Sequence, residues 1–157
     1  MIVSTGISGV TQVKKTVEFV RQVWIDSDII GQLALLHCVS SYPVPIAQAN
    51  LRSIQFLSEN FDETVGYSDH TVGIEAPILA VALGAKIIEK HFTLCRAYGS
   101  VDSAFSLEPE GMKSLVIETK RAWQSLGRNK YGPTKAEKSC DILNLVNSSS
   151  QNMAVIF

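Results

Sequence analysis

The sequence has no long hydrophobic run and no recognisable leader segment. The longest uncharged apolar stretch, around residues 76–85, has about ten residues, whereas a membrane-spanning helix needs about 20. The start of the chain has no basic region, no long apolar core and no small-residue cleavage site of the kind that secretory signals carry. These absences predict a cytoplasmic protein that has no membrane partner.

The sequence also lacks an excess of charge of one sign, and it has few cysteines. The 14 basic and 15 acidic residues give a formal charge of −1. Proteins that bind nucleic acid carry a basic patch, so this balance predicts no nucleic-acid partner and favours a small molecule or another protein. The three cysteines Cys38, Cys95 and Cys140 are scattered and never take C-x-x-C spacing, which predicts reduced thiols rather than a disulfide framework.

The apolar residues predict a single domain of four βα units. At 157 residues with 46% hydrophobic content, the chain can form one core. Short apolar runs alternate with helical patterns, which is typical of a parallel sheet with crossover helices. We expect strands at residues 2–3, 33–38, 65–68 and 86–91, and helices at residues 13–24, 51–61, 73–83 and 109–126. This pattern places the chain in the α/β class.

Polar side chains gather where the predicted strands end, which is where βα barrels carry their active sites. All three histidines, His37, His70 and His91, lie at such ends. For His37 we favour a structural, hydrogen-bonded role. His70 and His91 follow adjacent parallel strands about 5 Å apart, so they could share a metal ion or serve structural roles, and spacing favours neither. Two imidazoles without cysteine suit Mn, Fe, Co, Ni or Zn.

Other polar residues at the strand ends have both a functional and a local explanation. Ser4, Ser40 and Ser68 can bind a phosphate or carboxylate together with backbone amides, but serine is also common in turns. Asp69 can be a third metal ligand, although a cap for the turn or an orienting partner is favoured. No P-loop, dinucleotide-binding or G-x-S-x-G motif occurs, which argues against nucleotide loops and serine hydrolases.

Four stretches are more specific than these patterns. They are HCVSSYPVP (37–45), VGYSDHTVG (65–73), AVALGAKIIEKHFTL (80–94) and GSVDSAFSLEPE (99–110). Together they resemble the sialic acid synthase family, the phosphoenolpyruvate-dependent nonulosonate synthases. Within the family, Asp102-Ser103 followed by MKSLVIETKRAW resembles the pseudaminic acid branch, because neuraminate synthases usually carry aspartate-histidine at that point.

The resemblance implies an enzyme that condenses phosphoenolpyruvate with an N-acetylated amino sugar. The implied cofactor is a divalent metal, usually Mn, with Mg or Co as alternatives. For the pseudaminic acid branch the sugar is 2,4-diacetamido-2,4,6-trideoxy-altrose, and the alternative is N-acetylneuraminate synthesis from N-acetylmannosamine. The resemblance assigns His70 and His91 to the metal, and these two histidines together with Asp102 to catalysis. It assigns Ser4, Ser40 and Ser68 to the binding of phosphoenolpyruvate. It assigns Tyr42 and Asp102 to the binding of the sugar.

The resemblance covers only part of the family's architecture. It implies that residues 1–137 form the C-terminal half of a TIM (β/α)8 barrel, without the first four strands and without the family's C-terminal antifreeze-like domain. Residues 138–157 are expected to be an aberrant or disordered tail. A half-barrel leaves two strand edges unpaired, which predicts a homodimer or pairing with a missing barrel half.

These departures lead us to expect little or no synthase activity from the isolated chain. Lys90 is the nearest cationic candidate for the phosphate of phosphoenolpyruvate, and the strands that would bring further cations are absent. A non-catalytic remnant that dimerises is therefore the alternative from another functional class.

Overall fold

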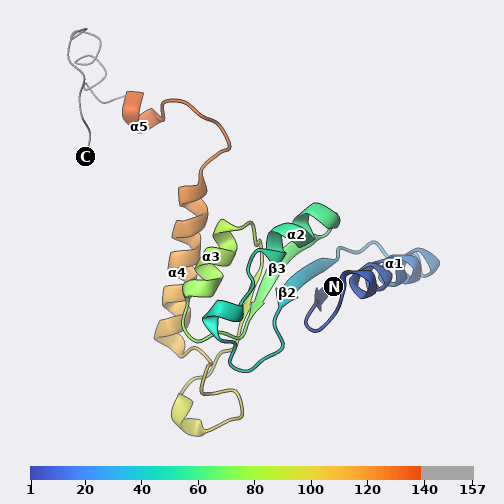
Figure 1. Ribbon diagram of the computed structural model, residues 1–157, viewed down its shortest axis with the longest axis horizontal. Helices are drawn as coiled ribbons and strands as arrows, with labels where there is room; N and C mark the ends of the chain where they lie inside the picture. Colours follow the sequence, from blue (N-terminus) through green and yellow to red (C-terminus); the bar gives the residue numbers. More distant parts are fainter. Residues whose placement is uncertain (139–157) are drawn as a thin grey trace. The chain divides into compact units, whose positions relative to one another are not determined.

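Four short parallel strands alternate with helices along most of the chain (Figure 1). The structure is a computed structural model that describes residues 1–138. These residues divide into a unit from Met1 to Leu126 and a segment that begins at Gly127. The tail predicted for residues 138–157 lies, from residue 139 onward, outside the described residues.

The first unit contains the four predicted βα units. In chain order its elements are β1 (Ile2–Ser4), α1 (Val10–Asp26), β2 (Ala34–Cys38), α2 (Ser53–Asn60), β3 (Thr64–Asp69), α3 (Glu75–Ala82), β4 (Ile88–Lys90) and α4 (Pro109–Leu126), with short 3-10 turns at Ile46–Gln48 and Arg96–Tyr98. The strand predicted at residues 86–91 is shorter than expected. Its ladder with β3 ends at the pair Asp69↔Lys90 because β3 itself ends there.

The strands form one sheet in the order β1-β2-β3-β4, and every neighbouring pair is parallel. Ser4 is paired with Leu36 in the first ladder, and Cys38 is paired with Ser68 in the second. Because all four strands run the same way, their carboxyl ends lie along one edge of the sheet. The predicted polar residues therefore gather at that edge.

The hydrophobic core lies on one face of the sheet, under the helices. Val65 and Tyr67 of β3 pack against α2 and α3, and Leu35 of β2 packs against α1. Successive side chains of a strand point to opposite faces, so Ser68 lies on the face away from the helices. On the same argument Ser4, Cys38 and Glu89 also lie on that open face.

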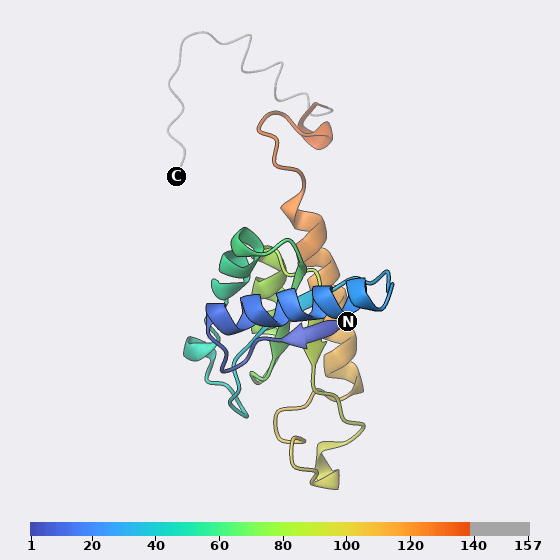
Figure 2. The same cartoon turned by 90° about the vertical axis from the view of Figure 1, so that its right-hand side faces the viewer.

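Apolar side chains are exposed beside both edges of the sheet. Next to β1, Phe19 and Ile25 of α1 and Ile30 of the following loop are largely exposed. At the other edge α4 lies alongside α3 in both views (Figures 1 and 2), and its Trp123 and Leu126 are exposed. The loop between β4 and α4, drawn in yellow, projects beyond the carboxyl end of the sheet (Figure 2).

Cys38 and Cys95 are free thiols, as predicted, while Cys140 lies outside the described residues. None of the helices within residues 1–138 combines the length and hydropathy needed to cross a membrane. In the second segment, helix α5 (Lys135–Lys138) begins with a capping box, in which Thr134 and Glu137 bond each other's backbone N–H groups at 3.3 and 2.6 Å.

The close packing around Gly66 gives a first prediction. A Cβ atom at this position would lie 2.5 Å from Leu36 Cδ2 and 2.6 Å from the backbone oxygen of Ile87. Because backbone cannot yield as a side chain does, we expect Gly66→Ala to destabilise the fold by about 3 kcal/mol, at the upper end for overpacking. Urea denaturation measures this loss.

The matched control is Gly9→Ala, because a Cβ there meets no atom within 4 Å. We expect this variant to lose less than about 1 kcal/mol, through its weaker N-cap preference alone. Equal losses in the two variants would contradict the packing argument.

Candidate functional site

His70 and His91 lie side by side at the carboxyl ends of β3 and β4. Each is the first residue after its strand, and the strands end at the register pair Asp69↔Lys90. The two imidazole centroids are 5.2 Å apart, with the rings at 71° to each other. The predicted juxtaposition of these two histidines is confirmed.

The surroundings of His70 determine which of its nitrogens is free. His70 Nδ1 lies 3.0 Å from the carbonyl oxygen of Val39. A carbonyl can only accept a hydrogen bond, so Nδ1 carries the proton in the neutral ring and Nε2 has the lone pair. Histidines that bind metals are commonly oriented in this way by a backbone carbonyl.

His91 faces a carboxylate from the loop between β4 and α4. Its Nδ1 is 3.5 Å from Asp102 Oδ2, and both side chains are partly exposed. The loop is folded back at its base, where Phe92 and Leu107 form a bridge and the N–H of Leu107 donates to the carbonyl of His91. The sequence prediction that Asp102 belongs to this site is thus consistent with where the loop places it.

Two aromatic side chains pack against the histidines. The ring centroid of Tyr42 is 4.2 Å from that of His70 and 6.1 Å from that of His91. The Phe105 ring, which is buried, is 5.1 Å from His91. Tyr42 is 55% exposed, so part of its ring is open to a ligand. Phe105 is a site residue that the sequence analysis did not single out.

The donor atoms of this site fit a two-histidine metal centre. His70 presents Nε2, and the contact between Asp102 and His91 Nδ1 leaves Nε2 of His91 as its ligand atom. Within residues 1–138, no group of three or more His, Cys, Asp and Glu side chains is arranged to hold a metal ion. An ion held here by two nitrogens would keep its other positions for water or substrate oxygens, which suits the metals that tolerate mixed N and O ligands.

Asp69 and Lys90 have a different role from the histidines that follow them. Lys90 Nζ is 2.7 Å from Asp69 Oδ2, and the two side chains are 1% and 0% exposed. Asp69 Oδ1 accepts the N–H of Thr71 at 2.8 Å, which confirms the turn-capping role that the sequence favoured. Lys90 also donates to the Thr71 carbonyl, so its ammonium is engaged inside the protein and does not fit the role of phosphate partner, for which it was the nearest cationic candidate.

The serines predicted to contact phosphoenolpyruvate do not share one environment. Ser68 is buried and donates to Glu89 Oε1 at 2.7 Å, whereas Ser4 and Ser40 are exposed. Within the described residues, none of the three serine hydroxyls hydrogen-bonds to His70 or His91. The sequence analysis did not single out Glu89 as a site residue, although it lies in β4 two residues before His91 and therefore on the same face.

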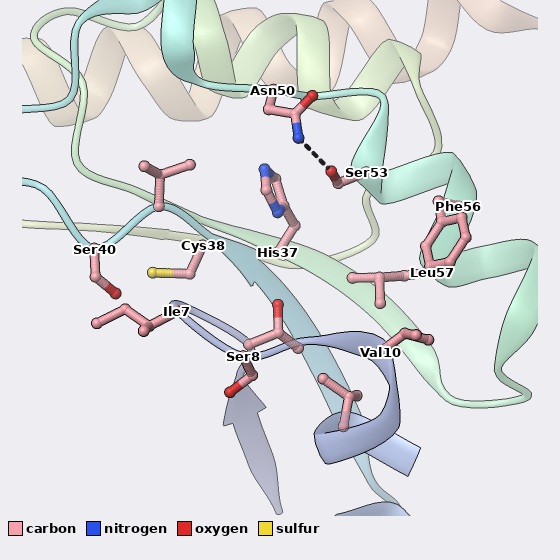
Figure 3. A pocket seen from close by; sticks show the side chains of 13 residues that line it. Ile7, Ser8, Val10, His37, Cys38, Ser40, Asn50, Ser53, Phe56 and Leu57 are labelled. Atoms are coloured by element: carbon pink, nitrogen blue, oxygen red, sulfur yellow. Dashed lines mark hydrogen bonds between the residues drawn. The ribbon is translucent and has the colours of Figure 1, made fainter.

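A cavity of about 490 Å³ lies next to this site, between the loop after β1 and the start of α2 (Figure 3). Ser40 and Cys38 line one side of it, and Phe56 and Leu57 line the other. Neither His70 nor His91 lines this cavity. The histidine pair therefore belongs to the open face of the sheet, and the cavity is a separate hollow.

His37 lines that cavity and has the structural role predicted for it. It lies on the helix side of the sheet, where Nε2 is 2.9 Å from the carbonyl oxygen of Ala49 and the ring stacks with Tyr67 at 5.7 Å. Burial lowers the pKa of His37, and the hydrogen bond to Ala49 opposes this effect in part. The folded protein therefore favours the neutral ring.

Comparison with known proteins places these residues in a family context. A model of the NeuB family matches residues 1–131. The chain is 39% identical to the N,N'-diacetyllegionaminic acid synthase of Legionella pneumophila over 87% of this chain and 38% of that protein. It is 41% identical to the pseudaminic acid synthase of Helicobacter pylori over 88% of this chain and 40% of that protein. The chain thus spans less than half the length of these relatives.

A solved structure supports the same relationship. The N-acetylneuraminic acid synthetase of Leptospira borgpetersenii, crystallised with citrate, superposes with a TM-score of 0.79 at 38% identity. The match covers 96% of this chain and 50% of that one. The four-stranded parallel sheet with its helices is therefore similar to part of a sialic acid synthase barrel.

The lowered pKa of His37 predicts a pH-dependent stability. Below the ordinary histidine pKa of 6.5, the unfolded chain takes up a proton that the folded chain resists. The unfolded state then binds more protons, so the free energy of unfolding falls as the pH falls below that value. Urea titrations at about pH 7.5 and pH 5.5 measure the effect, and His37→Gln is expected to reduce it. A variant with the same pH dependence would contradict this assignment.

Proposed function

Because the chain belongs to the NeuB family, we propose that it forms the C-terminal half of the catalytic barrel of a phosphoenolpyruvate-dependent nonulosonate synthase. The observation that carries the proposal is the pair formed by His70 and His91, with Asp102 and Tyr42 beside it. The reaction joins phosphoenolpyruvate to an N-acetylated amino sugar, and we keep the cytoplasm as its proposed compartment.

The sugar that we propose is 2,4-diacetamido-2,4,6-trideoxy-altrose, which makes the product pseudaminic acid. The support is Asp102-Ser103 in the loop that faces the histidines, together with the 41% identity to a pseudaminic acid synthase. Legionaminic acid synthesis is a second candidate because a relative of that name is 39% identical. N-acetylneuraminate synthesis is a third, supported by the similarity to the Leptospira synthetase.

The proposed reaction forms one bond between carbons and releases phosphate. The vinyl carbon of phosphoenolpyruvate attacks the aldehyde carbon of the open-chain sugar, water adds at C2, and the bond from C2 to the phosphate oxygen then breaks. A divalent metal, for which we propose Mn with Mg or Co as alternatives, supplies Lewis-acid polarisation of the aldehyde. His70 and His91 would hold this ion through Nε2.

The other residues of the chain would bind and orient the two substrates. The Val39 carbonyl and the Asp102 carboxylate would orient the two imidazoles, which lie next to them, and Asp102 would also accept a sugar hydroxyl. The exposed part of the Tyr42 ring offers an apolar wall for the sugar. Such positioning can be worth several kcal/mol of barrier.

We assign the hydroxyls of Ser4, Ser40 and Ser68 to phosphoenolpyruvate, as the resemblance implies. Ser68 would have to share its hydroxyl with Glu89, to which it donates a hydrogen bond. A carboxylate at this position opposes a phosphate unless a cation lies nearby. We therefore propose that the metal ion, and cations from the barrel units that this chain lacks, neutralise the phosphate at this position.

The partner that we propose is a second body of four βα units that closes the barrel. Both edge strands have an unpaired side, and parallel sheets are normally covered and paired. Beside β4, a groove of about 640 Å³ runs between Ile88 and the α4 residues Val116 and Trp123. We propose that the barrel units beyond this chain pack against this groove. In the isolated chain, a second copy would take their place.

The metal assignment gives a direct prediction. We expect the chain to bind Mn²⁺ in isothermal titration calorimetry, with tighter binding in the presence of phosphoenolpyruvate. His70→Ala and His91→Ala are expected to abolish tight binding because each removes one of two protein ligands.

His37→Gln is the matched control, since His37 lies on the other face of the sheet. The Mn²⁺ affinity of this variant should match that of the wild type. Unchanged binding in both alanine variants would remove the ligand assignment. Absence of Mn²⁺ binding by the wild-type chain would contradict the proposal that His70 and His91 form a metal site in this chain.

The open edges predict self-association of the isolated chain. We expect light scattering to give a dimeric mass at micromolar concentration, and Trp123→Ser to shift the equilibrium towards the monomer because Trp123, 68% exposed, lines the groove beside β4. Tyr98→Ser is the control, since Tyr98 is an aromatic residue of similar exposure, 75%, but lies in the loop before α4. A monomeric wild-type chain would contradict the proposed pairing.

A further inference from the structure

The two candidate metal ligands each follow directly after one member of a buried ion pair. Asp69 is the last residue of β3 and precedes His70, and Lys90 is the last residue of β4 and precedes His91. The Nζ–Oδ2 distance is 2.7 Å, with the side chains 1% and 0% exposed. Both the ion pair and the histidine pair therefore connect the carboxyl ends of β3 and β4.

The ion pair is held by further hydrogen bonds on its own side of the sheet. Asp69 Oδ1 accepts from the Tyr67 hydroxyl at 3.0 Å and from the N–H of Thr71 at 2.8 Å. Lys90 Nζ also donates to the carbonyl of Thr71. Burial and the Asp69 carboxylate raise the pKa of Tyr67, so its hydroxyl stays protonated and remains a donor. Both oxygens of Asp69 are therefore occupied.

Stability alone does not account for such a pair. The cost of removing two charges from water offsets much of their attraction, and apolar residues of similar volume often give a fold of equal stability. A buried ion pair does, however, restrict the relative placement of the two backbones that carry it. Consecutive Cα atoms are about 3.8 Å apart, so any slip between Asp69 and Lys90 would be passed on to the histidines.

We propose that the ion pair between Asp69 and Lys90 is a positioning device that sets the separation of His70 and His91. Asp69 and Lys90 touch neither metal nor substrate, and they act through the strand ends that they join. The consequence for metal binding rests on the proposed function, whereas the effect on the separation of the two rings does not.

The main test variant is the double substitution Asp69→Asn with Lys90→Met. Asparagine keeps Oδ1 as the acceptor for Tyr67 and Thr71, and methionine replaces the lysine stem without leaving an unpaired buried charge. The matched control is Glu63→Gln, which breaks the ion pair between Arg21 and Glu63 at 2.6 Å, just before β3 begins. Both variants lose one ion pair, at opposite ends of β3, but only the pair of Asp69 and Lys90 joins the residues that directly precede the histidines.

The first readout is Mn²⁺ affinity, measured by calorimetry on the 157-residue chain. We expect the double variant to bind Mn²⁺ roughly ten- to a hundredfold more weakly, as is typical when partners that orient metal ligands are removed. The Glu63→Gln control should stay within about twofold of the wild type. Wild-type affinity in the double variant would overturn the proposal.

The second readout needs no metal and separates this proposal from the proposed function. Nuclear Overhauser contacts between the rings of His70 and His91 should be lost or weakened in the double variant and kept in Glu63→Gln. The resonances of His37, which lies on the opposite face, provide the reference. If the wild-type chain binds no Mn²⁺, the metal assignment fails while this contact still decides the positioning role, and an unchanged contact overturns it.

A milder variant keeps the test decisive if circular dichroism shows that the double variant does not fold. Tyr67→Phe removes one hydrogen bond to Asp69 and leaves both charges and the aromatic ring in place. Because Asp69 Oδ1 then keeps only the N–H of Thr71 as a donor, the carboxylate is held less firmly against Lys90. We therefore expect the contact between the two histidine rings to weaken while the helical content stays constant. Wild-type contact strength in this variant would then overturn the proposal.

Discussion

The parallel pairing of four short strands is the constraint on which the rest of the structure depends. It places all carboxyl ends at one edge of the sheet, and the register pair Asp69↔Lys90 aligns the ends of β3 and β4. His70 and His91 are 21 positions apart in sequence, yet this alignment brings their ring centroids to 5.2 Å from each other. A shift of one residue in this register would reverse the faces on which they lie.

The two faces of the sheet differ in polarity and in the role of their side chains. On the helix side, Val65, Tyr67 and the apolar faces of α2 and α3 bury the core, and the ion pair of Asp69 and Lys90 is enclosed there with them. On the open side lie Ser68, Glu89, His70 and His91. Among the described residues, the buried ammonium of Lys90 lies on the helix side, whereas the open side carries the carboxylate of Glu89, with Asp102 beside His91.

The sequence predicted much of this architecture, and its failures have local causes. Helix α4 begins at Pro109 and ends at Leu126 as expected, because proline at the first turn and Gly127 after the last are strong signals. Lys90 was misjudged as a phosphate partner because sequence alternation alone does not show that Asp69 is its register partner. Phe105 and Glu89 were not singled out because Phe105 lies in an irregular loop and Glu89 is a charged residue in a short strand, which sequence alone does not distinguish from a solvent-exposed position.

By itself, the sequence determined the α/β class, the four βα units, the strand ends that carry polar residues and the family to which the chain belongs. These follow from periodicity and from motifs, which are properties of neighbouring residues. Only the tertiary structure decided that Asp69 and Lys90 form a buried pair, that Val39 fixes the tautomer of His70 and that Asp102 reaches His91. These contacts join different elements, so they depend on register and loop geometry rather than on local sequence.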